Sequence, residues 1–577
     1  MRFSIKGLIL IGCLFTSALN CYSLDREAFT FTNYDLQVRI EPDQHRLGVR
    51  GKVTLRNDSA IAQKIAVLQV SSSLDWRSVT AASRPLQFVS QPYTSDIDHT
   101  GALSEAIVTL PQAIAPKAAI DLDVAYEGVI VLDTTRLTRI GAPEAEARNS
   151  DWDQIGASFT AVRGVGYVAW YPIATESANL SDLNSVSNTV GRSKVRSAES
   201  RMSCVLEATR GSTILFGGTP DLFTMPKEEG ISTVAVFSIV RLGMNVPTFV
   251  IADYKKMDVK GLYTVDFLPG NEKAAASYAD VLGDFDSLPA ARGPRRLQVV
   301  ELPHPDAASF VTESMLLTPL KQSVTEEDRL TTIYALAKQR DLSPRPWITE
   351  GLAHLAQVMD IERQRGRKAA LDYLDAHRTL LTIAEGQTNL ANASLGQRDR
   401  DFAVTHSLLG TTDEVYLQSK ALWVWSMLRD MIGDTRLRIV LFAYEGVGDK
   451  EPTYVQRILE KTSQRDLEWF FDDWVYRDHG LPDFKVESAF SRKTLSAAYV
   501  VTVTVDNLGA AGAEVPVTVK FSGGEVTKRL EVRARNKAVI RVEVPTTPQE
   551  VVLNDGSVPE SDTTNNVFKI ETSETEK

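Results

Sequence analysis

The 577-residue sequence is poor in cysteine, and two of its three cysteines lie within the first 21 positions. Once a leader peptide is removed, only Cys204 is left, and a single thiol cannot form an internal disulfide. The sequence also lacks any block of lysine and arginine, and its formal net charge is −11. Because a polyanion needs a concentrated basic face, we expect no nucleic-acid partner.

Long apolar runs are missing beyond the N-terminus. The run at 7–19 follows two basic residues, and small residues at the −3 and −1 positions allow cleavage before Leu24. Such a short run does not comfortably span a bilayer. We therefore expect a signal peptide at 1–23, no transmembrane segment in the mature chain, and a periplasmic or secreted protein. Cys13 follows Leu-Ile-Gly, which leaves a lipid anchor as an alternative.

The motifs of several enzyme classes are missing as well. The sequence contains no G-x-S-x-G elbow, no P-loop, no dinucleotide-binding fingerprint and no paired-cysteine site. Serine, nucleotide-dependent and redox enzymes are therefore unsupported, although a catalytic triad built from distant residues stays open.

The length of the chain predicts several domains, because single hydrophobic cores stop growing at about 300 residues. Residues 24–258 are strand-like, and the stretch 35–57 alternates apolar and polar residues around a polar turn. We expect an N-terminal antiparallel β domain there. Residues 483–577 contain short strands separated by polar and glycine-containing turns, which predicts a C-terminal β-sandwich.

Between these regions, in residues 259–482, apolar residues recur every three or four positions, as is typical of helices. The expected helices cover residues 271–288, 324–340, 347–365, 367–384, 414–432, 452–462 and 466–476, and a short strand is expected at 295–302. The predicted fold class is therefore a multidomain α+β protein.

Three parts of the sequence resemble one known family. The stretch 35–57 is similar to the beginning of its N-terminal β domain, and WITEGLA at 347–353 is similar to its motif W-L-N-E-G-F-A. Residues 420–434 and 466–482 are similar to two of its later helical elements. This is the aminopeptidase N (membrane alanyl aminopeptidase) family of gluzincin zinc metallopeptidases. The resemblance implies a thermolysin-like α/β part, followed by an all-helical part, within 259–482.

In that family, zinc is held by two histidines of an H-E-x-x-H helix and by a later glutamate, and the glutamate inside the motif is the general base. The later glutamate corresponds to Glu350, but H-E-x-x-H is absent from this sequence. The best match, at 334–339, places Tyr334 and Lys338 at the ligand positions and Ala335 at the base. A protonated amine cannot bind zinc. The resemblance thus implies a degenerate member with one vestigial ligand, no catalytic residue and no cofactor.

A carboxylate at position 350 that lacks its cation is costly to bury. We therefore expect Lys338 to form a salt bridge with Glu350 in place of the metal bond. The alternative is a relocated zinc site, in which Glu350 and His354, four residues apart on one helix, are joined by His304. That arrangement would make the protein an active metallopeptidase.

Other family positions are altered too. The tyrosine that stabilises the transition state is replaced by Gln418, with Tyr416 as a substitute if the local loop shifts. The segment that binds the amino terminus of the substrate corresponds to 309–319, which places Thr312 or Glu313 near its key acid. We take these four residues as candidate peptide-binding positions. We expect a non-catalytic protein that binds a peptide or protein partner in an interdomain cleft; a structural protein of the cell envelope is the second alternative.

Overall fold

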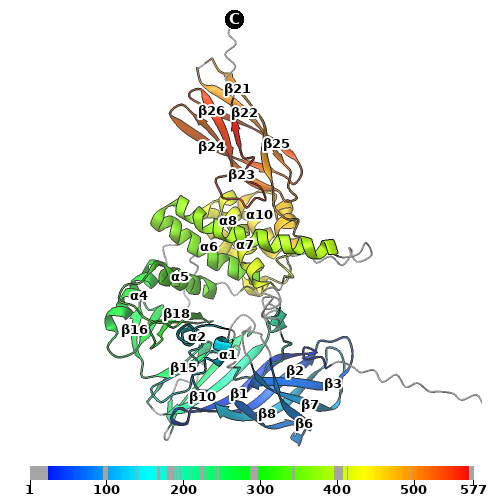
Figure 1. Cartoon of the computed structure of the whole chain (residues 1–577), viewed down its shortest axis with the longest axis vertical. Coiled ribbons are helices and arrows are strands. Elements are labelled where there is room, and N and C mark those ends of the chain that lie inside the picture. The colour runs from blue at the N-terminus through cyan, green and yellow to red at the C-terminus, as the bar shows by residue number, and fades with distance from the viewer. Residues whose placement is uncertain are drawn as a thin grey trace, which may run out of the picture.

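The computed structural model describes residues 24–570 except for 95–101, 140, 165–168, 178–188, 190, 191, 194, 195, 210, 221–226, 230, 231, 241, 243–245, 286–296, 313, 341, 342, 344, 395–406, 412 and 496. The expected signal peptide, the lipid-anchor alternative and Glu313 therefore lie outside the described residues. The described part is a mixed α+β structure, with sheets at both ends of the molecule and helices between them (Figure 1).

The N-terminal part is built around a nine-stranded sheet with the order β12-β14-β10-β1-β2-β8-β4-β5, in which β13 also pairs with β14. These strands are β1 (Phe29–Glu41), β2 (Arg46–Asn57), β4 (Leu74–Ala81), β5 (Arg84–Pro85), β8 (Ala119–Val129), β10 (Arg201–Thr209), β12 (Thr219–Pro220), β13 (Lys227–Glu229) and β14 (Ser232–Val240). A second sheet, β3-β7-β6, consists of β3 (Gln63–Ser71), β6 (Phe88–Tyr93) and β7 (Leu103–Ile114). The two sheets share one hydrophobic core.

Strands β1 and β2 form the hairpin that the alternation in 35–57 predicts. In β1, alternate side chains from Leu36 to Ile40 are buried, and a 3-10 turn at Pro42–Gln44 closes the hairpin. The expected antiparallel domain needs one correction, because β1 pairs in parallel with β10, for example at Asn33 and Arg201. These strands are far apart in the chain, so a long crossover and not a hairpin sets their direction.

A small sheet and two short helices join this part to the next. The sheet has the order β11-β15-β9 and contains β9 (Phe159–Val162), β11 (Thr213–Phe216) and β15 (Phe249–Ala252). The helices are α1 (Thr135–Arg139) and α2 (Glu144–Ser150). Side chains of this region, including Trp152 and Val250, share a hydrophobic cluster with Val300 and Met315 of the following sheet.

The middle part begins with a five-stranded sheet of order β16-β17-β18-β20-β19. Its strands are β16 (Lys255–Val259), β17 (Tyr263–Phe267), β18 (Leu297–Glu301), β19 (Phe310–Val311) and β20 (Met315–Thr318), and helix α4 (Glu272–Phe285) follows β17. The expected boundary between residues 258 and 259 cuts β16, which pairs with β17 and so belongs to this sheet. The alternation of residues that is typical of strands continues across that boundary, so periodicity alone does not locate the boundary between the two domains.

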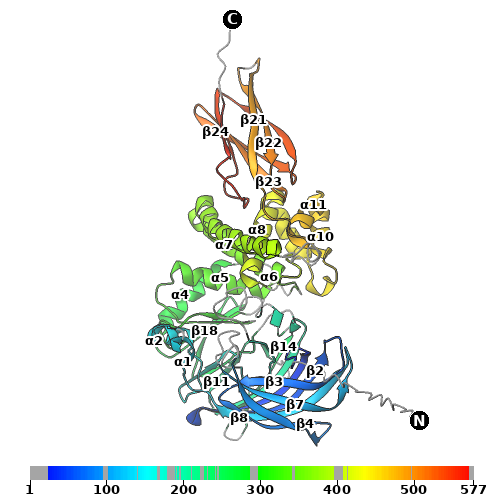
Figure 2. The same cartoon turned by 45° about the vertical axis from the view of Figure 1, so that its right-hand side comes forward.

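Helices follow this sheet (Figure 2). They are α5 (Glu326–Arg340), α6 (Pro346–Arg365), α7 (Arg367–Ser394), α8 (Glu414–Ile432), α9 (Asp434–Ala443), α10 (Tyr454–Ser463) and α11 (Glu468–Phe471), the last continuing into the π-helical turn η7 (Asp472–Tyr476). Every helix expected after residue 320 is present, and α8 has the predicted bounds. Helix α9 was missed, because it follows α8 after only Gly433, which has a positive φ of 81°.

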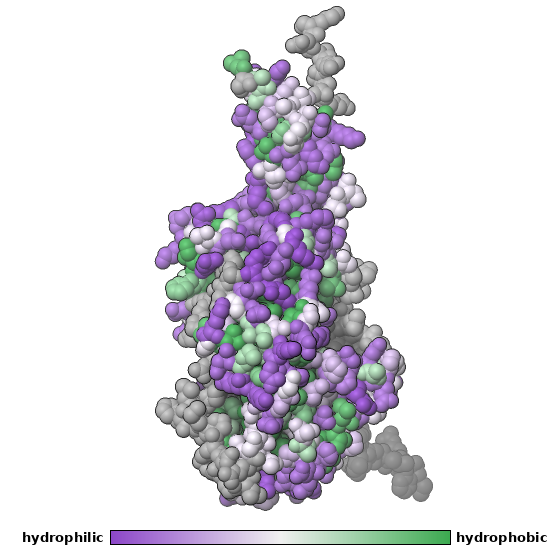
Figure 3. Space-filling view, turned by 90° about the vertical axis from the view of Figure 1, so that its left-hand side faces the viewer, coloured by the Kyte–Doolittle hydropathy of each residue, from purple (hydrophilic) through white to green (hydrophobic). Residues whose placement is uncertain are grey.

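The C-terminal part is a sandwich of two sheets, β21-β22-β25 and β24-β23-β26-β27. Its strands are β21 (Phe484–Lys493), β22 (Tyr499–Asn507), β23 (Ala513–Phe521), β24 (Gly524–Val532), β25 (Lys537–Val544), β26 (Pro548–Leu553) and β27 (Val567–Lys569). Inward valines of β22 and β23 pack in the same hydrophobic cluster as the helices. The face shown in Figure 3 is mostly hydrophilic, and no helix among the described residues is long and apolar enough to cross a membrane.

Candidate functional site

Helices α5 and α6 bring together the three residues on which the expectation of a degenerate site rests. Nζ of Lys338 lies 2.8 Å from Oε1 of Glu350, so the expected ion pair is confirmed. The hydroxyl of Tyr334 donates to the other carboxylate oxygen, Oε2, at 2.6 Å. Nζ of Lys338 also donates to the Tyr334 hydroxyl at 3.1 Å. Both oxygens of Glu350 are therefore engaged by side chains of α5.

The helices reach this geometry through their packing. Tyr334 and Lys338 are four residues apart and lie on one face of α5. Helix α6 lies closely against α8, because a Cβ on Gly351 would be 2.4 Å from Cδ1 of Trp425. Trp347, fully buried one turn earlier, stacks on Trp425 with ring centroids 5.6 Å apart. The tryptophan and glycine of the W-x-x-E-G pattern thus fix α6, and with it the position of the carboxylate.

The electrostatics of this cluster favour a charged lysine and a neutral tyrosine. Burial opposes the charge on Lys338, but Glu350 and Tyr334 together outweigh burial and raise the pKa of the ammonium group. Burial, opposed by the lysine charge, raises the pKa of Tyr334, so its hydroxyl stays protonated. The Glu350 side chain is only 8% exposed and that of Lys338 is 23% exposed. The carboxylate is thus neutralised by an ammonium and hydrogen-bonded by a phenol.

His354 lies beside this cluster but does not join it. Its Nδ1 is 2.9 Å from Oε1 of Gln357, and Tyr373 donates to the same oxygen at 3.0 Å. The amide of Gln357 is oriented by its donation to the carbonyl of Leu330, so Nδ1 of His354 carries the proton. Nε2 of His354 is then the deprotonated nitrogen, and it is buried with no hydrogen-bond partner among the described residues.

His377 of α7 is a second histidine beside this cluster, and no sequence pattern singled it out. The rings of His354 and His377 have centroids 5.6 Å apart, and Nδ1 of His377 lies 3.4 Å from Oγ of Ser419. Burial lowers the pKa of both histidines, that of His377 to about 4. Both rings are therefore neutral near pH 7.

The structure does not bring the relocated metal ligands together. His304 lies in an exposed loop after β18, where the amide of Asp306 donates to its Nδ1 at 3.4 Å. His304, Glu350 and His354 do not form a group of ligand atoms within 4.8 Å. The group of that kind found in the described part of the chain is Asp472, Asp473 and His479, and it lies on and just after the η7 turn.

Thr312 and Tyr416 are both engaged in structural contacts. Thr312 follows β19, is buried, and donates from Oγ1 to the carbonyl of Val246 at 2.7 Å. Tyr416 lies in the first turn of α8 and not in a loop, and Asp413 caps that turn by accepting from its backbone amide. The side chain of Tyr416 is fully buried, and its hydroxyl donates to Asp478.

The partner of Tyr416 was missed by sequence reasoning. Asp478 also accepts from Nζ of Lys420 at 3.0 Å, and this lysine is fully buried, with its ammonium 4.5 Å from the ring centroid of Trp474. The signal was present in the sequence, because a lysine inside the apolar run 420–428 needs a carboxylate partner. Gln418, half-buried on α8, shares that helix with Tyr416 but not its contact with Asp478.

Comparisons with known proteins found similarity only among solved structures. No protein-family model matches the chain, and no curated protein matches it. The M1 zinc metallopeptidase from Deinococcus radiodurans is 14% identical with a TM-score of 0.46, and the match covers 76% of this chain and 91% of that chain. A mutant of that enzyme is 14% identical with a TM-score of 0.47, over 79% of this chain and 96% of the other. Because these values are low, no residue role is transferred from either structure.

Proposed function

We propose that this protein is an exported pseudopeptidase of aminopeptidase N-like architecture, in which Lys338 supplies the positive charge that a zinc ion would otherwise provide. One observation carries the proposal, namely the 2.8 Å contact between Nζ of Lys338 and Oε1 of Glu350. The lysine is covalently part of the chain, so this carboxylate is neutralised without any metal. Export rests on the segment 1–23, which has the pattern of a cleavable leader.

The residues around Glu350 do not fit a zinc ion. Zinc in proteins takes thiolate, imidazole and carboxylate ligands. Here the carboxylate faces an ammonium group and a protonated phenol, and the ammonium would repel a divalent cation. Ala335, at the position of the general base, has no group that accepts a proton. Metal-assisted peptide hydrolysis by these residues is therefore not supported.

The helical architecture does not need catalytic chemistry, because large apolar contacts hold α6 against α8. The close approach at Gly351 and the stacking of Trp347 on Trp425 do not involve the lysine or the carboxylate. Burial of such large side chains stabilises the helices with or without a metal. We therefore propose that the protein keeps a peptide-binding or protein-binding role between its N-terminal sheets and its helices.

The loss of zinc is tested by measuring the zinc content of the purified mature protein by mass spectrometry, and its hydrolysis of peptide substrates with and without a chelator. We expect substoichiometric zinc and no chelator-sensitive hydrolysis. A matched variant, Tyr334→His combined with Lys338→His, restores two imidazoles one helical turn apart and is expected to acquire zinc. Stoichiometric zinc and chelator-sensitive hydrolysis in the unchanged protein would establish the active metallopeptidase instead.

The binding role is tested separately with peptides that carry a photo-crosslinking side chain. Crosslinks mapped to residues between the N-terminal sheets and the helices would support it. Crosslinks confined to the C-terminal sandwich, or none at all, would favour a structural protein of the envelope.

A further inference from the structure

Two histidines on neighbouring helices come together beside the Lys338–Glu350 ion pair without taking part in it. Helices α6 and α7 are separated only by Gly366. His354 lies twelve residues before this glycine and His377 lies eleven residues after it, so the two side chains meet across the helical hairpin. Their ring centroids are 5.6 Å apart.

A hydrogen bond holds one nitrogen of each ring and leaves the other nitrogen open. Nδ1 of His354 donates to Gln357, so Nε2 of His354 keeps its lone pair, buried without a partner in the described part of the chain. Nδ1 of His377 lies 3.4 Å from Oγ of Ser419, and with Ser419 accepting, Nε2 of His377 keeps its lone pair too. Histidines that bind metals almost always donate their second nitrogen in this way. A buried polar atom without a partner is also a common mark of a bound ion.

The separation of the two rings suits one shared ion. An imidazole nitrogen lies about 2 Å from a metal that it binds, so two rings on one ion have centroids about 5 Å apart at a tetrahedral angle and about 6 Å apart in a line. The observed 5.6 Å lies between these limits. Burial lowers the pKa of both histidines, so near pH 7 no proton competes with a metal for the two lone pairs.

The ligand set favours a monovalent ion. Within the described residues, no carboxylate or thiol joins His354 and His377 in a group of three ligands. Both oxygens of Glu350, the nearby carboxylate, are already engaged. Zinc sites use at least three protein ligands, and a divalent ion between two neutral rings would keep both charges uncompensated by an anionic ligand. Copper(I) carries a single charge, binds imidazole and is satisfied by two or three ligands.

We propose that His354 and His377 form a copper(I) site, in which Nε2 of each ring binds the ion and Gln357 and Ser419 hold the rings in place. A bound ion joins α6 to α7 at a point where no direct hydrogen bond between the two histidines does so in the described residues. The site uses neither Lys338 nor the oxygens of its carboxylate partner. It therefore does not rest on the proposed function, and its test is separate from the zinc and hydrolysis measurements.

The test uses the full mature protein without an affinity tag. Copper(I) is added under reducing, oxygen-free conditions in competition with a chromophoric chelator, and the ligands of the bound ion are identified by X-ray absorption. We expect one equivalent of copper(I) bound by nitrogen ligands. Failure to compete with the chelator, or a spectrum dominated by sulfur ligands, would overturn the proposal.

Substitutions locate the ion. His354→Gln and His377→Gln each remove one ligand and are expected to weaken copper(I) binding at least about a hundredfold, whereas Gln357→Leu removes only the acceptor of Nδ1 and should weaken it about tenfold. His304→Gln, the same change in the exposed loop after β18, should leave binding unchanged. Circular dichroism shows whether each variant is folded. If folded His354→Gln and His377→Gln proteins hold copper(I) as tightly as the unchanged protein, the two histidines are not the site.

Discussion

Replacing Lys338 by methionine is the most direct test of the proposed replacement of a metal by this lysine. The change keeps a long side chain on α5 but removes the ammonium that lies 2.8 Å from Glu350. The carboxylate, only 8% exposed, then keeps the hydroxyl of Tyr334 as a donor but loses its counter-charge. Breaking a buried ion pair on one side typically costs about 3–5 kcal/mol. Because Lys338 is 23% exposed and solvent screens part of its charge, we expect about 2–3 kcal/mol.

The cost of protonating Glu350 sets an independent upper limit on the stability that the Lys338→Met variant can lose. The stranded carboxyl can take up a proton, which at pH 7 costs about 3.7 kcal/mol for a group with an ordinary pKa near 4.3. The loss of folding stability in this variant therefore cannot much exceed about 3.7 kcal/mol. In the variant, the folded-state pKa of Glu350 would lie above its unfolded value, so the folded form binds the extra proton. The difference in folding stability between the unchanged protein and the variant should then shrink as pH falls from 7 to 5 and grow as pH rises.

The measurement is native-state hydrogen exchange of the amides in α5 and α6, because a chain with several domains does not unfold in one step. A double-mutant cycle with Glu350→Gln isolates the pairwise interaction. We expect a coupling free energy of about 2 kcal/mol at pH 7. Additive effects of the two substitutions, or a deficit that does not depend on pH, would refute the view that the lysine compensates the carboxylate.

Three further predictions concern the helices. Gly351→Ala places a Cβ 2.4 Å from Trp425 and should sharply speed hydrogen exchange in α6 and α8, whereas Gly410→Ala, with its nearest contact at 3.6 Å, should not. Asp478→Asn leaves the buried ammonium of Lys420 without its counter-charge and should cost about 3–5 kcal/mol, seen as faster hydrogen exchange in α8. The pKa of His377 is about 4 when folded and about 6.5 when unfolded, so stability should fall by about 1–2 kcal/mol from pH 7 to pH 5, and less so in a His377→Gln variant.

The sequence was sufficient where a local pattern settles the structure. Alternation in 35–57 predicted the β1–β2 hairpin, and apolar spacing predicted α8 with its observed bounds. The salt bridge of Lys338 with Glu350 followed from a simple charge argument, because a buried carboxylate needs a cation or a proton. Each of these predictions depends on residues that are close in the chain or on one unavoidable pairing.

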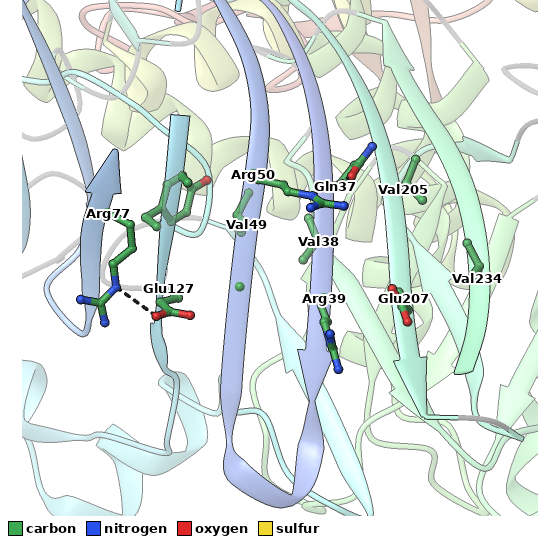
Figure 4. A pocket seen from close by; sticks show the side chains of 13 residues that line it. Gln37, Val38, Arg39, Val49, Arg50, Arg77, Glu127, Val205, Glu207 and Val234 are labelled. Carbon is green, nitrogen blue, oxygen red and sulfur yellow. Dashed lines mark hydrogen bonds and ion pairs between the residues drawn. The ribbon is translucent and has the colours of Figure 1, made fainter. Parts of the chain in front are cut away.

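The sequence was insufficient where distant segments meet. The parallel pairing of β1 with β10 depends on a crossover that periodicity does not describe. The contact of Tyr416 with Asp478 joins α8 to the segment after η7, and the neighbourhood of His354 and His377 requires α6 and α7 to pack at a particular rotation. A groove on the nine-stranded sheet, lined by residues of β4, β8, β2, β1, β10 and β14, appears only when those strands are placed in register (Figure 4).

A fixed ammonium and a bound metal neutralise the same carboxylate with different consequences. Zinc keeps an open coordination position at which water and substrate can react, whereas a lysine amine on Oε1 and a phenol on Oε2 leave Glu350 with both oxygens engaged. The lysine is also joined to α5, so its contact ties that helix to α6 continuously and does not depend on metal supply. On the function proposed above, the substitution exchanges reactivity for a permanent link between two helices. Such an exchange would suit a protein that holds a partner without transforming it.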